Sequence, residues 1–401
     1  MWQVMAGQSL PRVALLWPQF AAYHVDRCEA VARRLSGRAE VWAVEVATSS
    51  TTYAWKPSGK VEGARKITLF PDQDFDALSA RKRIWPQFSL LRKCSMVLIG
   101  VGYSQIDIII LSWLLRLLGV NVVVMSESKF DDFQRSAGFE LFKSVLLFSY
   151  SAAIVGAQRQ LSYLRFLGFG RRKVLPGYDS VGLDRVRTQG GGVLAPEGEL
   201  YCARNFIFVG RFVAKKNLTR LLESYAAYVA LTGEGARRLV LVGSGPDEAS
   251  LRERIAALGI EDMVDLPGFL GAEEVSQMLA RSLALLLVST EEQWGLVVNE
   301  ALAFGLPVIA SDAVGSRDVL VRNLVNGFVV EPGSINGIAQ AMHTLAGDEQ
   351  LWRRMVAASH QRSWLGDTER LADAVELLLD PDAQPAGSRV CEFLKIMGTE
   401  G

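Results

Sequence analysis

Short apolar runs separated by helical segments recur along most of this 401-residue chain. The runs lie at residues 12–17, 39–47, 95–102, 121–126 and 152–156, and then at 206–210, 238–243, 263–268, 283–289 and 306–311. Strands that alternate with helices build parallel, doubly wound sheets, whose central strands are apolar on both faces. Residues 48–94 are irregular and polar, and this pattern does not order them. The chain is therefore expected to be an α/β protein.

The length of the chain and a loop-forming segment near its middle predict two such sheets. A chain of 401 residues exceeds one typical hydrophobic core. The segment TQGGGVLAPEGEL is rich in Gly, Pro and Glu and is typical of a linker or an exposed loop. We expect a first domain at residues 1–187, a linker at 188–203, a second domain at 204–362 and a C-terminal helical region at 363–401. This last region could cross back to the first domain.

The two halves of the chain carry opposite charge, although the formal net charge is zero. Residues 1–185 hold 24 Lys and Arg against 15 Asp and Glu, and residues 186–401 hold 19 against 28. This is either ordinary solvated surface or a basic half that meets an anionic partner, such as a phospholipid surface or a lipid diphosphate. Segments 135–148 and 163–173 combine aromatics with cations, which fits core packing or peripheral membrane contact. Nucleic acid is not expected, because no reading motif accompanies the basic residues.

The longest apolar stretch, residues 106–125, is long enough to resemble a membrane span. Arg116 lies inside it and residues 119–121 have the composition of a turn, so a buried helix at 106–118 and a strand at 121–125 explain it better. The start of the sequence lacks the charged and apolar regions of a secretion signal. Together with four scattered cysteines, which form no CxxC pair, this predicts a cytoplasmic protein without structural zinc.

The segment EQWGLVVNEALAFGLPVIAS carries the clearest chemical signal. Glu292 and Glu300 are eight positions apart, with Gly295 between them, and residues 296–304 have helical spacing. Carboxylates accept hydrogen bonds from sugar hydroxyls, and the free N–H groups at a helix start favour phosphate. The combination predicts a site for a sugar attached to a phosphate.

This segment resembles the Glu-seven-residues-Glu signature of family 4 of the retaining glycosyltransferases. Those enzymes have the GT-B fold, in which two Rossmann-like doubly wound domains face each other across a cleft. FIFVGRFVAKKNLTRLLESYAAY, LVLVGSGPDEASLRERIAALGI, VDLPGFL and VGSRDVLVRNLVNGFVVEPGS are also similar to that family, in kind and in order. The likeness is strong over residues 204–335. It is weaker in the N-terminal half, where SESKFDD, LGF and LPGYDSVG look like the acceptor domain of one bacterial branch.

The resemblance implies a retaining hexosyltransferase that uses a nucleoside-diphosphate sugar and needs no metal or other cofactor. The acceptor would be a glycan or lipid-linked molecule in the synthesis of a cell-surface polysaccharide or glycolipid. The location would be cytoplasmic or peripheral on the inner face of the membrane. Two cations, Arg211 and Lys216, would bind the diphosphate, with Lys215 as the competing candidate. Glu292 would bind the donor sugar near its C3 hydroxyl, and Glu300 the ribose.

Backbone groups complete the implied donor site. Gly295, Leu296 and Val297 would offer N–H groups to phosphate or sugar. Gly243 follows a predicted strand and either makes a tight turn or lets the backbone approach the nucleotide. Phe269 follows the next strand and would line the base pocket.

The acceptor side is less clearly marked. His24 follows the first predicted strand and is either an acceptor-side residue or a helix-capping surface residue. Where family members carry a histidine after a middle strand, this chain has SES, and Glu127 there would orient or deprotonate the acceptor hydroxyl. Asp131 and Asp132 are either a metal-binding pair or a solvated or capping pair. GVGYSQ lacks the third glycine of a dinucleotide fingerprint, so no nicotinamide site is expected.

Two other functions compete with transfer. Glu292 and Glu300 could serve as the carboxylate pair of a glycoside hydrolase, although the predicted anion site at Arg211 and Lys216 argues against it. The chain could also be a non-catalytic sugar-nucleotide-binding subunit, although all the donor motifs are intact.

Overall fold

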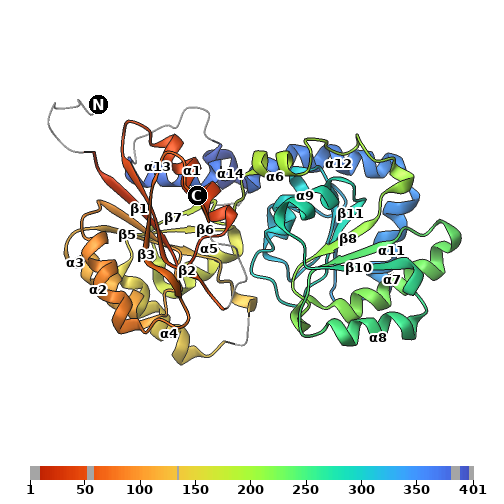
Figure 1. Ribbon diagram of the computed structural model, residues 1–401, viewed down its shortest axis with the longest axis horizontal. Coiled ribbons are helices and arrows are strands. Elements are labelled where there is room, and N and C mark those ends of the chain that lie inside the picture. The colour runs from red at the N-terminus through yellow and green to blue at the C-terminus, as the bar shows by residue number, and fades with distance from the viewer. Residues whose placement is uncertain (1–9, 52–57, 133–134, 381–388, 397–401) are drawn as a thin grey trace.

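The computed structural model of this protein describes residues 10–51, 58–132, 135–380 and 389–396. It shows two parallel β-sheets, each flanked by helices on both faces, in two domains that lie side by side (Figure 1). The doubly wound α/β architecture predicted from the alternating apolar runs is thereby confirmed.

The N-terminal sheet has the strand order β3-β2-β1-β4-β5-β6-β7, and every pairing is parallel. Its strands are β1 (Arg12–Trp17), β2 (Glu40–Ser49), β3 (Arg65–Asp74), β4 (Met96–Ile99), β5 (Asn121–Ser126), β6 (Ala152–Val155) and β7 (Lys173–Pro176). The helices between them are α1 (Ala22–Arg34), α2 (Ala80–Leu91), α3 (Ile106–Leu117), α4 (Ala137–Leu146) and α5 (Gln158–Leu164), and α6 (Leu183–Gln189) follows β7 on the way to the second sheet.

The C-terminal sheet has the order β10-β9-β8-β11-β12-β13 and is also parallel. Its strands are β8 (Phe206–Val209), β9 (Leu239–Val242), β10 (Val264–Gly268), β11 (Ala284–Leu287), β12 (Val308–Ser311) and β13 (Gly327–Val330). The later helices are α7 (Leu218–Thr232), α8 (Glu248–Leu258), α9 (Ala272–Ala280), α10 (Val297–Ala303), α11 (Ile335–Gly347), α12 (Glu349–Ser363), α13 (Glu369–Leu379) and α14 (Val390–Ile396).

The order of strands in each sheet reverses next to its first strand. The reversal lies between β1 and β4 in the first domain and between β8 and β11 in the second. In such sheets, ligands bind outside the carboxyl ends of the strands at this reversal. The fold therefore directs attention to the loops that follow β1, β4, β5, β8 and β11.

The long apolar stretch at residues 106–125 divides as predicted into helix α3 and strand β5, separated by a turn at Gly119. Five of the six residues of β5 are buried, because the strand lies inside the sheet with a neighbour on each side. Within the part of the chain that the structure describes, no helix combines the length and the apolar character needed to cross a bilayer.

The segment between the two domains is bound to the second domain. Ala195 is buried, its N–H donates to the carbonyl of Phe304 at 3.0 Å, and its carbonyl lies 2.7 Å from Nε2 of His360. Helix α6, just before this segment, packs against α9 and α10. The Gly-rich composition around residue 190 thus belongs to a connection that packs closely on the C-terminal domain.

The end of the chain returns to the N-terminal domain, where α13 packs against α1 (Figure 1). Arg34 of α1 forms ion pairs with Glu369, Asp373 and Glu376 of α13. The Asp373 side chain is fully buried, and Arg370 also lies 3.1 Å from it. A buried carboxylate needs such partners, because its desolvation costs free energy.

An Arg34→Met variant is therefore expected to lower the free energy of unfolding by about 2–3 kcal/mol, since Asp373 would keep only one of its two cations. Arg353→Met is the matched control. That arginine forms an exposed pair with Glu349 one helical turn away, which is worth at most about 0.5 kcal/mol. Chemical denaturation followed by circular dichroism measures both values, and equal stability of the two variants would contradict the prediction.

Candidate functional site

The carboxyl ends of the two sheets face each other across the boundary between the domains. Gln160 of α5 donates from Nε2 to the carbonyl of Gln293 at 3.1 Å, and Asn299 of α10 donates from Nδ2 to the carbonyl of Asp179 at 2.9 Å. These contacts join loops that follow β6, β7 and β11. The residues predicted for the donor and acceptor sides therefore border the same interdomain region.

On the C-terminal side, Lys216 and Glu292 form a direct ion pair between Nζ and Oε2. Both side chains are largely buried, with exposed fractions of 15% and 12%. The hydroxyl of Ser289 also donates to Oε2 of Glu292, at 3.3 Å. The sequence marked both residues as ligands of the same donor molecule, and the structure places their charged groups in contact.

The loop that carries Lys216 is bound to the loop that carries Glu292. Asn217 adopts a left-handed conformation with φ of 59° and donates from Nδ2 to the carbonyls of Val288 and Pro332. Asparagine tolerates this conformation better than most residues. The N–H of Thr290 in turn donates to the carbonyl of Lys215 at 2.8 Å, while the Lys215 side chain is exposed. The backbone thus directs Lys216, and not Lys215, toward Glu292.

Arg211 follows β8 and is exposed. Within the described part of the chain its guanidinium forms no hydrogen bond or ion pair with another side chain. A cation held at the carboxyl end of a central strand without a carboxylate partner is available to an anionic ligand.

Helix α10 begins at Val297, two residues after Gly295. Gly295 has φ of 90°, and a Cβ at this position would lie 2.8 Å from Cδ2 of Leu287 and 3.3 Å from Cγ of Glu292. Only glycine meets both the conformation and the space. The first-turn N–H groups, including those of Leu296 and Val297, lack acceptors within the helix. The structure thus places a helix start next to the carboxylate of Glu292.

Glu300 lies on α10 near Arg185 of α6 and Asp26 of α1. Arg185 and Asp26 bind each other, with Nη2 and Oδ2 at 2.8 Å, so Glu300 has a cation nearby that another carboxylate already holds. Burial raises the pKa of Glu300 to about 7, and Asp26 adds to this rise while Arg185 opposes it.

Gly243 and Phe269 lie at the ends of the neighbouring strands β9 and β10. A Cβ on Gly243 would lie 1.9 Å from the carbonyl oxygen of Gly210, so this glycine lets two loops of the same domain pack closely. The side chain of Phe269 is 70% exposed.

On the N-terminal side, His24 is buried rather than on the surface, with an exposed fraction of 5%. Its Nδ1 accepts a hydrogen bond from the N–H of Ala21 at 2.9 Å, so it does cap the start of α1. Burial, and then the charge of Arg27, lower the pKa of His24 well below its usual value. The ring is therefore neutral at pH 7.

Glu127 follows β5 and lies next to Asp179, which follows β7 and is 2% exposed. Burial raises the pKa of both carboxyl groups, that of Asp179 well above its ordinary value, and the negative charge of Glu127 adds to the rise of Asp179. The negative charge of Glu292, on the C-terminal domain, adds a smaller rise to the pKa of Glu127.

Arg27 lies near these two carboxyl groups, and its positive charge opposes the rise of their pKa values. It is fully buried, lies between the rings of Tyr23 and Tyr178, and donates from Nε to the carbonyl of Ser180 at 3.0 Å. Neither of its Nη atoms has a hydrogen-bond partner among the described residues. The sequence analysis did not single out Arg27 or Asp179 as site residues, and only LPGYDSVG, which contains Asp179, carried a signal of resemblance.

A cavity of about 290 Å³ lies beside these groups, at the carboxyl ends of β1, β4 and β5. Its lining combines aromatic rings with polar groups and includes Trp17, Tyr23, His24, Glu127 and Tyr178. Flat aromatic faces next to hydrogen-bonding groups suit a sugar ring.

Asp131 and Asp132 bind neighbouring cations and backbone. Oδ2 of Asp132 accepts from the N–H of Lys129 at 2.8 Å, and Asp131 forms ion pairs at 3.0 Å with Lys129 and Arg159. These contacts agree with the capping interpretation of the pair. Among the described residues, no three His, Cys, Asp or Glu side chains are grouped as a metal site.

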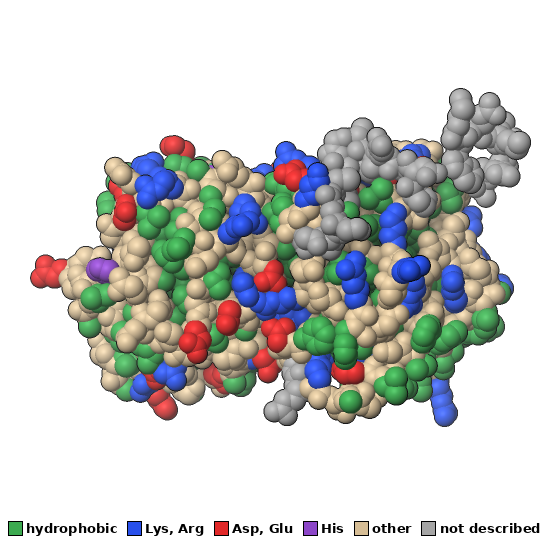
Figure 2. All heavy atoms as spheres, turned by 180° about the vertical axis from the view of Figure 1, so that it is seen from behind, with side chains coloured by type: hydrophobic (Ala, Val, Ile, Leu, Met, Phe, Trp, Pro, Cys, Tyr) green, Lys and Arg blue, Asp and Glu red, His purple; other side chains and the backbone are tan. Residues whose placement is uncertain are grey.

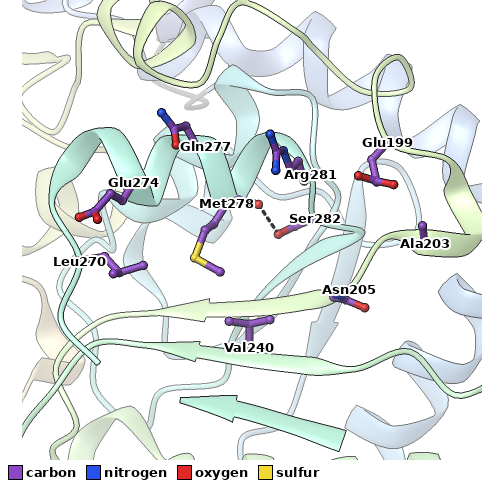
Figure 3. Close-up of a pocket in the computed structure, with 10 residues that line it drawn as sticks. All are labelled: Glu199, Ala203, Asn205, Val240, Leu270, Glu274, Gln277, Met278, Arg281 and Ser282. Carbon is purple, nitrogen blue, oxygen red and sulfur yellow. Dashed lines mark hydrogen bonds between the residues drawn. The ribbon is translucent and has the colours of Figure 1, made fainter. Parts of the chain in front are cut away.

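A separate cavity of about 360 Å³ lies on the C-terminal domain between α9 and strands β8 and β9 (Figure 3). Asn205 and Ser282 in its lining precede β8 and β11, so it opens near the amino ends of these strands. It contains none of the predicted site residues, and its position at this edge separates it from the interdomain site.

Comparison with known proteins supports the interpretation of the second domain. Residues 203–362 match the model of the family described as glycosyl transferases group 1. N-acetyl-alpha-D-glucosaminyl L-malate synthase of Bacillus anthracis is 33% identical over 141 residues, which are 35% of this chain and 36% of that protein. Lipopolysaccharide 1,6-galactosyltransferase of Escherichia coli is 29% identical over 43% of this chain and 48% of its own length. The chain thus spans less than half of each of these relatives.

Solved structures agree over almost the whole chain. Sucrose-phosphate synthase from Thermosynechococcus elongatus superposes with a TM-score of 0.67 at 19% identity, covering 92% of this chain and 98% of that one. The structure of HepE of Anabaena, in complex with UDP and glucose, superposes with a TM-score of 0.67 at 18% identity, covering 92% of this chain and 100% of that one. At this identity the likeness shows the fold. The chain has the two-domain GT-B fold, and its residues 203–362 match the family model of the glycosyl transferases group 1.

Proposed function

We propose that this protein is a retaining hexosyltransferase. It moves a hexose from a nucleoside-diphosphate sugar to a hydroxyl group of a glycan or lipid-linked acceptor, in the synthesis of a cell-surface polysaccharide or glycolipid. The observation that carries this proposal is the Lys216–Glu292 pair beside the start of α10, together with the exposed Arg211 that follows β8 in the same domain. Relatives named as galactosyltransferase and kanosaminyltransferase support the class of reaction.

The donor side supplies fixed positive charge where negative charge develops. When the bond between the anomeric carbon and the diphosphate breaks, the leaving group gains charge on its phosphate oxygens. Arg211, Lys216 and the first-turn N–H groups of α10 would stabilise that charge without reorganising. We propose that this makes a metal ion and an organic cofactor unnecessary. Glu292 then accepts hydrogen bonds from the sugar hydroxyls, and Glu300 from the ribose.

The acceptor side positions the incoming hydroxyl group. The new bond forms between the acceptor oxygen and the anomeric carbon as the bond to the phosphate breaks, and the hydroxyl proton passes to the departing phosphate. The chain therefore needs no protein nucleophile. We assign to Glu127, which lies beside Asp179, the role of orienting the acceptor hydroxyl by accepting a hydrogen bond from it.

The proposed setting is the cytoplasm or the inner face of the cell membrane, with peripheral contact to anionic lipid. The positive net charge of residues 1–185 supports this setting. A lipid-linked acceptor would then reach the cleft from the side of the N-terminal domain.

The affinity for a nucleotide sugar is expected to rise several-fold between about pH 6 and about pH 8, because Glu300 loses its proton near pH 7. The carboxylate accepts hydrogen bonds from two ribose hydroxyls, whereas the protonated form offers fewer acceptors. Calorimetry at several pH values measures the effect, and Glu300→Gln should flatten it. Asp184→Asn, which removes a fully exposed acid nearby, is the control. An unchanged slope in Glu300→Gln would remove Glu300 from the ribose site.

The proposed function is tested by ligand screening followed by product analysis. Thermal shift with uridine, guanosine and adenosine diphosphates identifies the base, and the matching nucleotide sugars are then incubated with and without glycan acceptors. Transfer predicts that nucleoside diphosphate and a new glycoside appear together. Free sugar as the main product under all conditions would indicate hydrolysis, and tight binding with no turnover of any donor would indicate a binding subunit.

A further inference from the structure

Exposed apolar side chains are concentrated on one part of the N-terminal domain. Twelve large hydrophobic residues with at least 39% exposure lie on α2, α3 and the residue that ends it, α4, the 3-10 turn Leu147–Ser149 and the π-helical turn Arg165–Phe169. They are Trp85, Ile106, Ile110, Trp113, Leu117, Leu118, Phe139, Leu141, Phe142, Val145, Phe148 and Phe166. A soluble monomer rarely exposes so many large apolar side chains together, and such patches mark interaction sites.

These elements form one continuous surface. Helix α2 packs on α3, and α4 packs on both the 3-10 turn and the π-helical turn. Ser149 of the 3-10 turn donates to Ser112 of α3 at 2.9 Å, and the guanidinium of Arg172 lies 5.8 Å from the ring centre of Phe148. Figure 2 shows hydrophobic side chains along the lower edge of the N-terminal domain, on the right of that view.

The exposed charges on the same elements are all positive. Residues 77–126 and the described residues 135–178 contain two acids, Asp107 and Glu140, and both are buried in ion pairs with Arg83 and Lys143. The exposed cations in these ranges are Arg81, Lys82, Arg92, Lys93, Arg116, Arg165, Arg171 and Lys173. Asp131, next to the surface on the loop of Phe130, is an exposed acid, and it is paired with Lys129 and Arg159. Apolar side chains set among an excess of cations match an anionic bilayer surface, where hydrocarbon lies beneath negative headgroups.

We propose that this basic apolar surface, made by the exposed side chains of α3, α4 and the two turns, docks the protein on an anionic lipid bilayer. Leu141, Phe142 and Phe166 enter the acyl boundary, while Arg116, Arg165 and Arg171 contact the headgroups. Burying the apolar side chains supplies most of the affinity, and the cations select negatively charged lipid.

The basic apolar surface continues to the acceptor side of the cleft. The ring of Phe130 lies 5.0 Å from that of Phe166 and 5.1 Å from that of Tyr163, measured between ring centres. Phe130 is three residues after Glu127 on the same loop. A bilayer bound at this surface would therefore lie next to the segment that carries the proposed acceptor-orienting carboxylate. Docking rests on the proposed membrane setting but not on the transfer reaction.

Co-sedimentation with vesicles tests the proposal on the full chain. Wild-type protein should bind vesicles of phosphatidylglycerol and phosphatidylcholine, and bind phosphatidylcholine alone at least about five-fold more weakly. The double variant Leu141→Ser, Phe142→Ser should bind the anionic vesicles more weakly than the wild type, by a factor of at least about ten. Leu231→Ser, which replaces a leucine of similar exposure on α7 of the other domain, is the matched control and should bind like the wild type.

A second variant tests the charges. Arg116→Gln together with Arg165→Gln should weaken binding to anionic vesicles and reduce its sensitivity to salt. Circular dichroism should show wild-type melting for all the variants, because the replaced side chains are exposed.

Several results would overturn the proposal. The first is that the wild type does not bind anionic vesicles. The second is that the double variant binds them as tightly as the wild type, and the third is that Leu231→Ser loses as much affinity as the double variant. Light scattering that shows a dimer dissociated by the double variant would assign the surface to a second copy of the chain instead. Turnover of a nucleotide sugar is measured separately, so that vesicle binding by a protein without transferase activity would reject the proposed function and leave the docking surface intact.

Discussion

The variant Lys216→Met is expected to lose about 10²–10³-fold in kcat with a nucleotide sugar and acceptor. The reason is that Lys216 supplies a fixed, largely buried positive charge next to the proposed diphosphate, where the leaving group becomes more negative in the transition state. Methionine keeps most of the length and apolar volume of lysine, so the change removes charge with little change in packing. Steady-state kinetics measures kcat, and calorimetry with the nucleoside diphosphate measures the ground-state part of the effect.

Lys215→Met is the matched control for this variant. Lys215 is the preceding residue, carries the same charge and is exposed, while its backbone carbonyl is fixed by Thr290. We expect its kcat to stay within about three-fold of the wild type, because an exposed charge is screened by solvent. A larger loss in Lys215→Met than in Lys216→Met would assign the diphosphate to Lys215 and contradict the orientation described above.

The second large effect concerns Glu292→Gln, for which binding and turnover should change in opposite directions. In the free protein the carboxylate of Glu292 is paired with Lys216, and a diphosphate must compete for this cation. Glutamine removes that competition, so nucleoside diphosphate should bind about three- to ten-fold more tightly, consistent with the modest strength of a partly solvated ion pair. Turnover should fall by about 10²-fold or more, because the sugar loses a charged hydrogen-bond acceptor.

Glu291→Gln serves as the control, since Glu291 is exposed and adjacent. Its affinity and kcat should match the wild type. Weaker binding of nucleoside diphosphate by Glu292→Gln would show that the carboxylate does not oppose the anion. A double-mutant cycle between Lys216→Met and Glu292→Gln then measures how strongly the two side chains depend on each other.

The central strands of both sheets could be predicted from sequence, and the edge strands mostly could not. Strands such as β5 are bounded by neighbours and helices on all sides, so their residues must be apolar. The missed strands β3, β7 and β13 each lie at the edge of a sheet, where one side faces solvent. β3 has few buried residues and contains Pro71, and α2, also missed, contains Pro86. Proline and polar residues interrupt the apolar pattern by which such exposed strands and helices would be recognised in the sequence.

The donor side of the site lies in one local motif, which explains why the sequence marked it. Glu292, Gly295 and Glu300 are within one loop and helix, so their spacing is visible along the chain. The acceptor-side group of Arg27, Glu127 and Asp179 comes from three segments far apart in sequence. No spacing links them, and only the folded sheet brings the ends of their elements together. The direct contact of Lys216 with Glu292 likewise depends on tertiary structure.

The central claim is that the C-terminal domain binds the diphosphate of an activated sugar through Arg211, Lys216 and the start of α10. A crystal structure of the protein with a non-hydrolysable nucleotide sugar tests it most directly. The account predicts density for the diphosphate at these groups, with Nζ of Lys216 moved from Glu292 to a phosphate oxygen and the sugar hydroxyls at Glu292. A ligand bound elsewhere, or a diphosphate distant from an unchanged Lys216–Glu292 pair, would contradict it.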